Sequence, residues 1–211
     1  MAHDNNYKDF GYSKAEGSHM HEHFMPQVLA FASGLQPGAR LLDIGCGNGA
    51  ACGEFIKRGY QVVGLDLSEQ GIAIARRNHP AGRFELMAAD EDVLEQLNEA
   101  PFDLVISTEV VEHLYAPRAW ARGCFMALKP GGSLICSTPY HGYLKNLLLS
   151  LAGKWDSHAD PLWDGGHIKL WSRKSLGRLL TETGFEDLSF KGVGRLPWLW
   201  MTMVMKATKP H

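Results

Sequence analysis

A short apolar segment that runs straight into three alternating glycines constrains this chain more than any other feature. The segment is LLDIGCGNG, residues 41–49, and residues 50–58 follow it with a helical pattern. The apolar residues predict a buried strand, and the glycines let the backbone turn tightly and let a ligand approach the main chain. Position 50 is alanine, so the dinucleotide fingerprint is incomplete, and no Gly-Lys-Ser/Thr phosphate loop follows. An ordinary tight turn is the alternative interpretation.

The same strand-to-helix pattern recurs along most of the chain. A parallel sheet with helices on both faces is the usual result of such alternation. The chain is 45% apolar and 21% charged, which is enough apolar material for a folded core and too much for a disordered chain. We expect strands at 41–44, 61–65, 83–88, 102–107, 133–137, 185–191 and 201–207, and helices at 21–32, 50–58, 68–78, 92–98, 117–128 and 172–183.

Two carboxylates frame the glycine loop. Asp43 lies two residues before the first glycine, where a carboxylate would repel a pyrophosphate and would suit a cation or an ammonium group. Asp66 ends the second expected strand, seventeen residues after Gly49. An acid at that place can accept both ribose hydroxyls of a nucleoside. The alternative is that Asp66 caps the helix that begins near Ser68.

Four segments in order resemble the signature segments of class I S-adenosylmethionine-dependent methyltransferases. They are LLDIGCGNG, VVGLDLS, FDLVISTEVVEHL and LKPGGSLICSTP, and the resemblance covers about residues 38–140. It implies a Rossmann-like α/β fold with seven strands, mostly parallel with the last strand antiparallel, and helices on both faces. It also implies S-adenosylmethionine as the cofactor.

The resemblance assigns the parts of the cofactor to residues of this chain. Asp43 and the glycine loop would face the methionine end, Asp66 would hold the ribose, and Asp90 would meet the adenine. Glu91 and Asp92 leave the adenine assignment ambiguous, and an acid at a helix N-terminus is the alternative. The expected cofactor-binding residues are Asp43, Gly45, Cys46, Gly47, Gly49, Asp66, Leu67, Asp90 and Thr108.

A second group of polar residues follows the fourth expected strand. If residues 109–114 are helical, Glu109, Glu112 and His113 share one face, where two carboxylates and an imidazole can hold a divalent metal. With His167, which precedes a later helix, the pattern resembles ubiquinone-biosynthesis O-methyltransferases and small-RNA 3′-terminal 2′-O-methyltransferases. We therefore expect Glu109, Glu112, His113 and His167 as ligands of Mg²⁺ or Mn²⁺. Without a metal, His113 and His167 are the candidates for catalytic base, and acids at a helix N-terminus are the structural alternative.

We expect one methyltransferase domain over residues 1–211, with an N-terminal arm and helix at 1–34 and a lid-like insertion at 140–170. A small-molecule acceptor, aromatic or lipophilic and methylated at a hydroxyl oxygen, fits the resemblance and the formal charge of −2. The alternatives are ribose 2′-O-methylation of RNA, N- or C-methylation of a small metabolite, and a cofactor-binding regulator without catalysis. The four cysteines form no C-x-x-C pair, and the first residues are not a signal peptide. A cytoplasmic protein with buried thiols and no transmembrane segment is therefore expected.

Overall fold

The computed structural model describes residues 11–12, 19–88, 90–163 and 166–211. Most of the expected N-terminal arm, and residues 164–165 of the expected insertion, lie outside these ranges. The described chain forms one seven-stranded sheet in the order β3-β2-β1-β4-β5-β7-β6. Its strands are β1 (Arg40–Ile44), β2 (Gln61–Asp66), β3 (Arg83–Leu86), β4 (Phe102–Thr108), β5 (Leu128–Pro139), β6 (Glu186–Val193) and β7 (Thr202–Thr208).

The pairing of the strands confirms the expected fold class. Strands β1 to β5 pair in parallel, and β7 runs antiparallel between β5 and β6. Because strand order reverses between β1 and β4, the carboxyl ends of these two strands form the edge where ligands bind in open α/β sheets. The strands in the middle of the sheet are almost wholly buried, as is required when helices cover both faces of a sheet.

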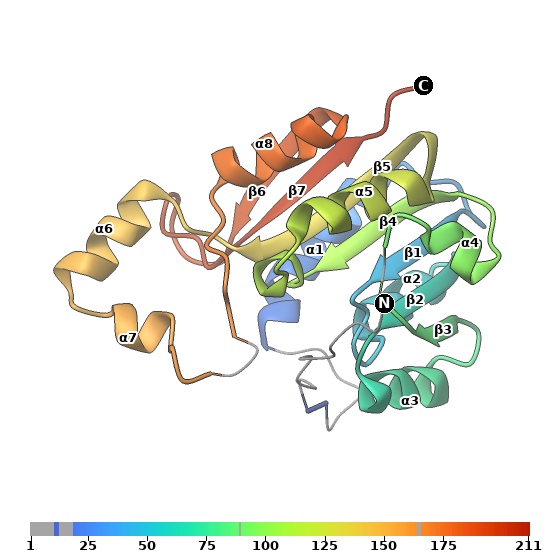
Figure 1. The fold of residues 1–211 in the computed structure, drawn as a ribbon, viewed down its shortest axis with the longest axis horizontal. Coiled ribbons are helices and arrows are strands. Elements are labelled where there is room, and N and C mark those ends of the chain that lie inside the picture. The colour runs from blue at the N-terminus through green and yellow to red at the C-terminus, as the bar shows by residue number, and fades with distance from the viewer. Residues whose placement is uncertain (1–10, 13–18, 89, 164–165) are drawn as a thin grey trace.

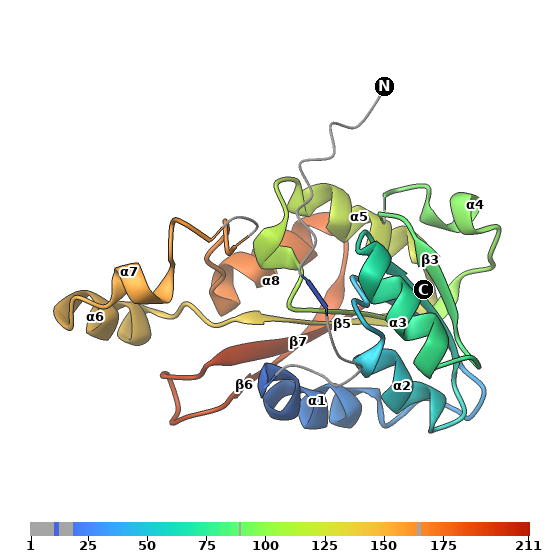
Figure 2. The ribbon, with the colours of Figure 1, turned by 90° about the horizontal axis from the view of Figure 1, so that it is seen from below.

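Helices cover both faces, and each face has its own apolar core. One core joins the sheet to α4, α5 and α8, and the other joins it to α1, α2 and α3. Figure 2 shows α5 and α8 on one side and α1 and α2 on the other. The helices are α1 (His19–Ala32), α2 (Ala50–Ile56), α3 (Glu69–Asn78), α4 (Val93–Leu97), α5 (Pro117–Ala127), α6 (Tyr143–Leu151), α7 (Trp155–His158) and α8 (Arg173–Thr183).

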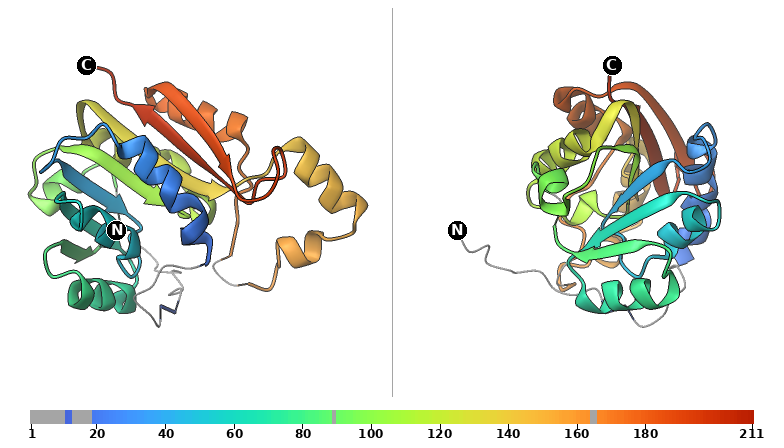
Figure 3. Two further views of the ribbon diagram at one scale, coloured as in Figure 1. Left: turned by 180° about the vertical axis from the view of Figure 1, so that it is seen from behind. Right: turned by 90° about the vertical axis from the view of Figure 1, so that its right-hand side faces the viewer.

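Helices α6 and α7 belong to the segment that interrupts the alternation. They project beyond the end of the sheet where β5 finishes, and the loop between β6 and β7 lies on the same side (Figures 1 and 3). Among the described residues, no helix has the length and apolarity that crossing a membrane requires.

The elements differ from the expected ones mainly at their ends. Strand β5 begins at Leu128, ahead of the expected strand at 133–137, and its register with β4 shifts between Phe102 and Leu104. The largest difference is at residues 109–114, where the only helical part is the 3₁₀ turn η1 (Val111–His113). The expected helix over residues 109–114, with Glu109, Glu112 and His113 on one face, is therefore wrong.

A buried hydroxyl ties the glycine-loop end of β1 to β4 and α5. Ser107 Oγ donates to the carbonyl oxygen of Ile44 at 2.8 Å and accepts the indole N–H of Trp120 at 3.1 Å. All three residues are buried. Because Ile44 immediately precedes Gly45, this link helps to hold the loop in place.

We expect Ser107→Ala to lower the free energy of unfolding by about 1–3 kcal/mol, because it leaves two buried polar groups unpaired. Urea unfolding followed by circular dichroism measures the change. Ser157→Ala, which removes an exposed hydroxyl on α7, should change stability by no more than about 0.5 kcal/mol. Equal effects from the two substitutions would show that the Ser107 link contributes nothing.

Candidate active site

The glycine loop turns sharply at the carboxyl end of β1. Gly45, Gly47 and Gly49 have φ values of 81°, 52° and 78°, a region that side chains other than glycine rarely occupy. The amide groups of Gly45 and Cys46 both donate to the carbonyl oxygen of Leu65, at 2.8 and 2.9 Å. A Cβ at Gly45 would overlap Val110. The loop is therefore held against β2 and the segment after β4, and its glycines are required by conformation and by space.

The Asp66 carboxylate joins the glycine loop to the next helix. Its Oδ2 accepts the Gly47 amide at 2.7 Å, and its Oδ1 accepts the Ser68 amide at 2.8 Å. Ser68 in turn caps α3, accepting the amide of Gly71 at 2.9 Å. The structure thus shows Asp66 orienting the helix entry, as the alternative interpretation supposed. A carboxylate oxygen can accept more than one hydrogen bond, so these two bonds do not exclude a ligand hydroxyl.

The side chain of Tyr12 lies against this loop. A Cβ at Gly47 would overlap its phenol ring, and a Cβ at Gly71 would lie 3.1 Å from it. Because Gly47 and Gly71 lie on either side of the Asp66 bridge, the Tyr12 side chain covers the loop at this point. No sequence motif pointed to this residue.

Asp43 is fully buried behind the glycines. Its Oδ2 accepts the Cys52 thiol at 3.1 Å, and within the described residues its Oδ1 has no hydrogen-bond partner. Burial raises the pKa of Asp43 to about 7, with a smaller contribution from the charge of Asp66. A half-satisfied buried carboxylate of this kind has unused capacity for a cation.

The other expected cofactor residues lie around the same edge. Cys46 is buried in the loop, Leu67 is exposed directly after Asp66, and Thr108 ends β4. Asp90 is exposed, and within the described residues its carboxylate has no hydrogen-bond partner. The two neighbouring acids are engaged elsewhere: Glu91 pairs with Arg122, and Asp92 accepts from Gln96. Of the three acids, Asp90 is the one available to a ligand.

Glu109 has an unexpected backbone. Its φ is 55°, so the chain turns in the left-handed region directly after β4 instead of starting a helix. The side chain explains the turn, because Oε1 accepts the hydroxyls of Ser137 at 2.7 Å and Thr202 at 2.8 Å. The amide of Glu109 also donates to the Ser137 carbonyl at 3.0 Å. Contacts with β5 and β7, distant in sequence, thus override the helical pattern.

Glu112, His113 and His167 come together beside this turn. One donor atom from each of the three lies within 4.8 Å of the others, and Glu109 is not part of this group. Glu112 is 1% exposed; its Oε2 accepts the Thr138 hydroxyl at 2.8 Å. Within the described chain its Oε1 lacks a hydrogen bond, and it lies 3.9 Å from His113 Nε2. Burial, and next the charge of Glu109, raises the pKa of Glu112 well above its usual range.

The backbone of the insertion holds the two histidines against each other. His113 Nδ1 lies 3.1 Å from the Gly166 carbonyl oxygen, which can only accept, so Nδ1 carries the proton and Nε2 offers a lone pair toward Glu112. The amides of Ile168 and Lys169 both donate to the Glu112 carbonyl at 3.0 Å. Burial, and next His113, lowers the pKa of His167 to about 4. His167 therefore has a nitrogen available to a proton or a metal near neutral pH.

Two further buried residues, His141 and Lys145, lie next to this cluster. His141 is 6% exposed and stacks on Trp155 with ring centroids 6.3 Å apart. Lys145 is 7% exposed and donates from Nζ to the Tyr140 carbonyl at 2.8 Å. His141 closely follows the fifth strand, where it can face a substrate or be a plain loop residue, whereas Lys145 lies in no motif and only the three-dimensional arrangement brings it to the site.

The four cysteines are free and buried, in agreement with the expected thiols. Burial raises the pKa of Cys52 and Cys124 well above the usual value, so both stay protonated.

Comparison with known proteins places the chain in a family. A family model described as "Methyltransferase domain" matches residues 17–189. A ubiquinone biosynthesis O-methyltransferase of Idiomarina loihiensis is 31% identical over 158 residues, covering 74% of this chain and 65% of the relative. One from Maricaulis maris is 39% identical over 111 residues, covering 50% and 43%. The chain thus spans less than two thirds of these relatives.

Solved structures share the fold at low sequence identity. A methyltransferase in complex with the Trm112 methyltransferase activator of Haloferax volcanii has a TM-score of 0.67 at 18% identity, with 90% of each chain covered. The magnesium protoporphyrin IX methyltransferase of Synechocystis, solved with bound S-adenosylhomocysteine, has a TM-score of 0.66 at 20% identity, covering 88% of this chain and 81% of that one. From the family model, the relatives and the site, the chain belongs to the class I S-adenosylmethionine-dependent methyltransferases.

Proposed function

We propose that this protein transfers the methyl group of S-adenosylmethionine to a hydroxyl oxygen of a small-molecule acceptor. The observation that carries the proposal is the placement of two half-satisfied buried carboxylates, Asp43 and Glu112, on either side of the carboxyl edge of β1 and β4. The first adjoins a glycine loop, and the second adjoins two imidazoles. The names of the ubiquinone-biosynthesis relatives support an oxygen acceptor.

The residues at the glycine loop fit the cofactor. Asp43 has a carboxylate oxygen available to an ammonium group, the Asp66 carboxylate can accept ribose hydroxyls, and the exposed Asp90 can accept from an adenine amine. When bound, S-adenosylmethionine supplies an electrophilic methyl group for in-line attack. The protein's part is to hold donor and acceptor in line, with Tyr12 covering the loop.

On the acceptor side, His113 or His167 takes the proton of the attacking hydroxyl. The Gly166 carbonyl fixes the His113 tautomer, so its Nε2 is the basic atom, and Glu112 beside it stabilises the imidazolium that forms. The same three side chains fit a divalent ion, since Glu112 Oε1 is an unpartnered buried oxygen. A bound Mg²⁺ or Mn²⁺ would lower the pKa of the acceptor hydroxyl. We propose Glu112, His113 and His167 as its ligands, with Glu109 near them.

Asp66→Ala should weaken the binding of S-adenosylhomocysteine by roughly 1–3 kcal/mol, because it removes charged acceptors of ribose hydroxyls. Isothermal titration calorimetry gives the affinity, and a thermal melt shows whether the variant is folded. Glu69→Ala removes a nearby exposed acid that does not reach the loop and should bind as the parent does. Equal affinity of the Asp66 variant and the parent would remove Asp66 from the cofactor site.

Cofactor affinity should rise with pH up to about 7. In the free protein the pKa of Asp43 is raised to about 7, and pairing with an ammonium group lowers it. Below pH 7, binding must therefore expel a proton, which costs up to about tenfold in affinity per pH unit. Titration of S-adenosylhomocysteine between pH 5.5 and 7.5 should show a rise of about tenfold or more. In Asp43→Asn the rise should disappear, and a flat parent profile would contradict the assignment.

If the histidine cluster holds a metal, the protein with bound S-adenosylhomocysteine should bind one Mn²⁺ per chain. Electron paramagnetic resonance of free Mn²⁺ measures the uptake. Glu112→Ala should abolish it, because it removes the only carboxylate of the cluster, while His158→Ala, which changes a histidine outside the cluster, should not. With catechol as a probe acceptor, a chelator should stop methylation and Mn²⁺ should restore it. Absence of Mn²⁺ uptake would reject the metal and leave the histidines as bases.

A further inference from the structure

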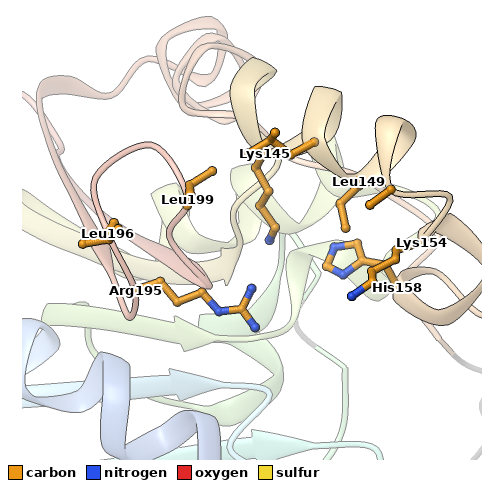
Figure 4. Close-up of a pocket in the computed structure, with 9 residues that line it drawn as sticks. Lys145, Leu149, Lys154, His158, Arg195, Leu196 and Leu199 are labelled. Carbon is orange, nitrogen blue, oxygen red and sulfur yellow. The ribbon is translucent and has the colours of Figure 1, made fainter.

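A cavity of about 530 Å³ lies between the projecting helices and the loop that joins β6 to β7. A volume of this size suits a small organic ligand. Helix α6 supplies one wall, and residues 195–199 of the β6–β7 loop supply the opposite wall. Figure 4 shows side chains from both walls directed into the space between them.

Basic groups converge in this cavity. Lys145 and Arg195 enter from opposite walls with their charged ends toward each other, and His158 and Lys154 approach from the α7 side (Figure 4). Within the described ranges, Lys145, Lys154 and Arg195 form no ion pair with a carboxylate. Lys145 is buried, with 7% of its surface exposed, and its Nζ donates a hydrogen bond to a neutral carbonyl. Like charges gathered with no carboxylate in ion-pair contact favour an anionic ligand.

Leucines line the rest of the walls. Leu148 and Leu149 come from α6, and Leu196 and Leu199 from the opposite loop. Leu148 and Leu196 are 43% and 71% exposed, which is unusual for large apolar side chains unless they meet a ligand or partner. The loop also holds Arg195 and Trp198 at φ values of 50° and 69°, a costly backbone that persists where the surroundings or the function require it.

The cavity adjoins the proposed acceptor site. His158, on the cavity wall, packs edge-on against His141 with ring centroids 5.3 Å apart. Burial is the main cause of the lowered pKa of His167. The charges of His158 and Lys145 lower it further, so the cavity and the histidine cluster interact electrostatically. Burial likewise lowers the pKa of Lys145 to about 8, with Arg195 lowering it further and Glu109 opposing.

We propose that the cavity recognises the acceptor as an amphiphilic acid, with a carboxylate or phosphate between Lys145 and Arg195 and an apolar body against the leucines. This inference rests on the proposed function and names the acceptor's chemical class. The acidic group anchors the molecule, and its hydroxyl reaches the histidine cluster next to the cavity. Guanidinium and ammonium groups together accept either a planar carboxylate or a phosphate.

Decanoate, decyl phosphate and decanol serve as matched probes, the two acids kept below their critical micelle concentrations and decanol below its solubility limit. Titration calorimetry is run on the protein with and without bound S-adenosylhomocysteine. We expect saturable 1:1 binding of at least one acid, at least about tenfold tighter than decanol. The stronger of the two acids identifies the headgroup.

Variants locate the binding in the cavity. Arg195→Gln lies on an exposed loop and should weaken acid binding about tenfold without changing decanol binding, and Lys154→Gln should weaken it less. Arg178→Gln removes an equal charge from α8, where Arg178 pairs with Glu182, and should change nothing. Thermal melts confirm that each variant is folded.

Three results would overturn the inference: equal binding of acids and alcohol, unchanged acid binding in Arg195→Gln, or binding seen only with phosphatidylglycerol vesicles, which would indicate a lipid surface instead. The S-adenosylhomocysteine titrations separate this inference from the proposed function. If that ligand binds and the acids do not, only the acidic acceptor is rejected. If it does not bind, the methyltransferase proposal fails, while acid binding to the free protein still tests the cavity.

Discussion

Burial of carboxylates at the carboxyl edge of the sheet is the constraint on which the rest of the site depends. Asp43 and Glu112 are 0% and 1% exposed, and each has one oxygen without a hydrogen bond within the described residues. A charged group in this position is costly unless a partner compensates it. The raised pKa values of both groups express that cost. The fold thus maintains two sites that a cation, or a proton, would complete.

The two sites differ in how locally they are built. The cofactor side depends on residues close in sequence: a strand, three glycines, and Asp66, which bridges the glycine loop and the start of α3. For that reason the sequence alone predicts the glycine loop and Asp66, and the family resemblance adds a seven-stranded sheet with an antiparallel last strand. The sequence also indicates that Asp43 belongs to this site. It does not predict the raised pKa of Asp43, because that pKa depends on how completely the folded chain buries β1.

The acceptor side depends on contacts between distant segments, and here prediction from sequence fails in part. A helical pattern over 109–114 put Glu109 on one face with His113, but hydroxyls of Ser137 and Thr202 turn Glu109 into a left-handed conformation. The pairing of His113 with His167 was expected from resemblance, and the 3₁₀ turn achieves it without the helix. Lys145 and Arg195 are fifty residues apart and carry no motif, so only the folded chain brings them into one cavity.

Because one half of the site is built from local segments and the other from distant ones, the two halves differ in how readily their residues can be substituted. A change in the glycine loop or at Asp66 disturbs β1, β2 and α3 together, because the same hydrogen bonds hold the loop and start the helix. A change in α6, α7 or the β6–β7 loop alters a wall that lies outside the sheet, as Figure 1 shows. On the proposed assignment, acceptor preference can therefore change through these segments while the glycine loop keeps its geometry. Loops and insertions on a rigid sheet carry specificity for this reason.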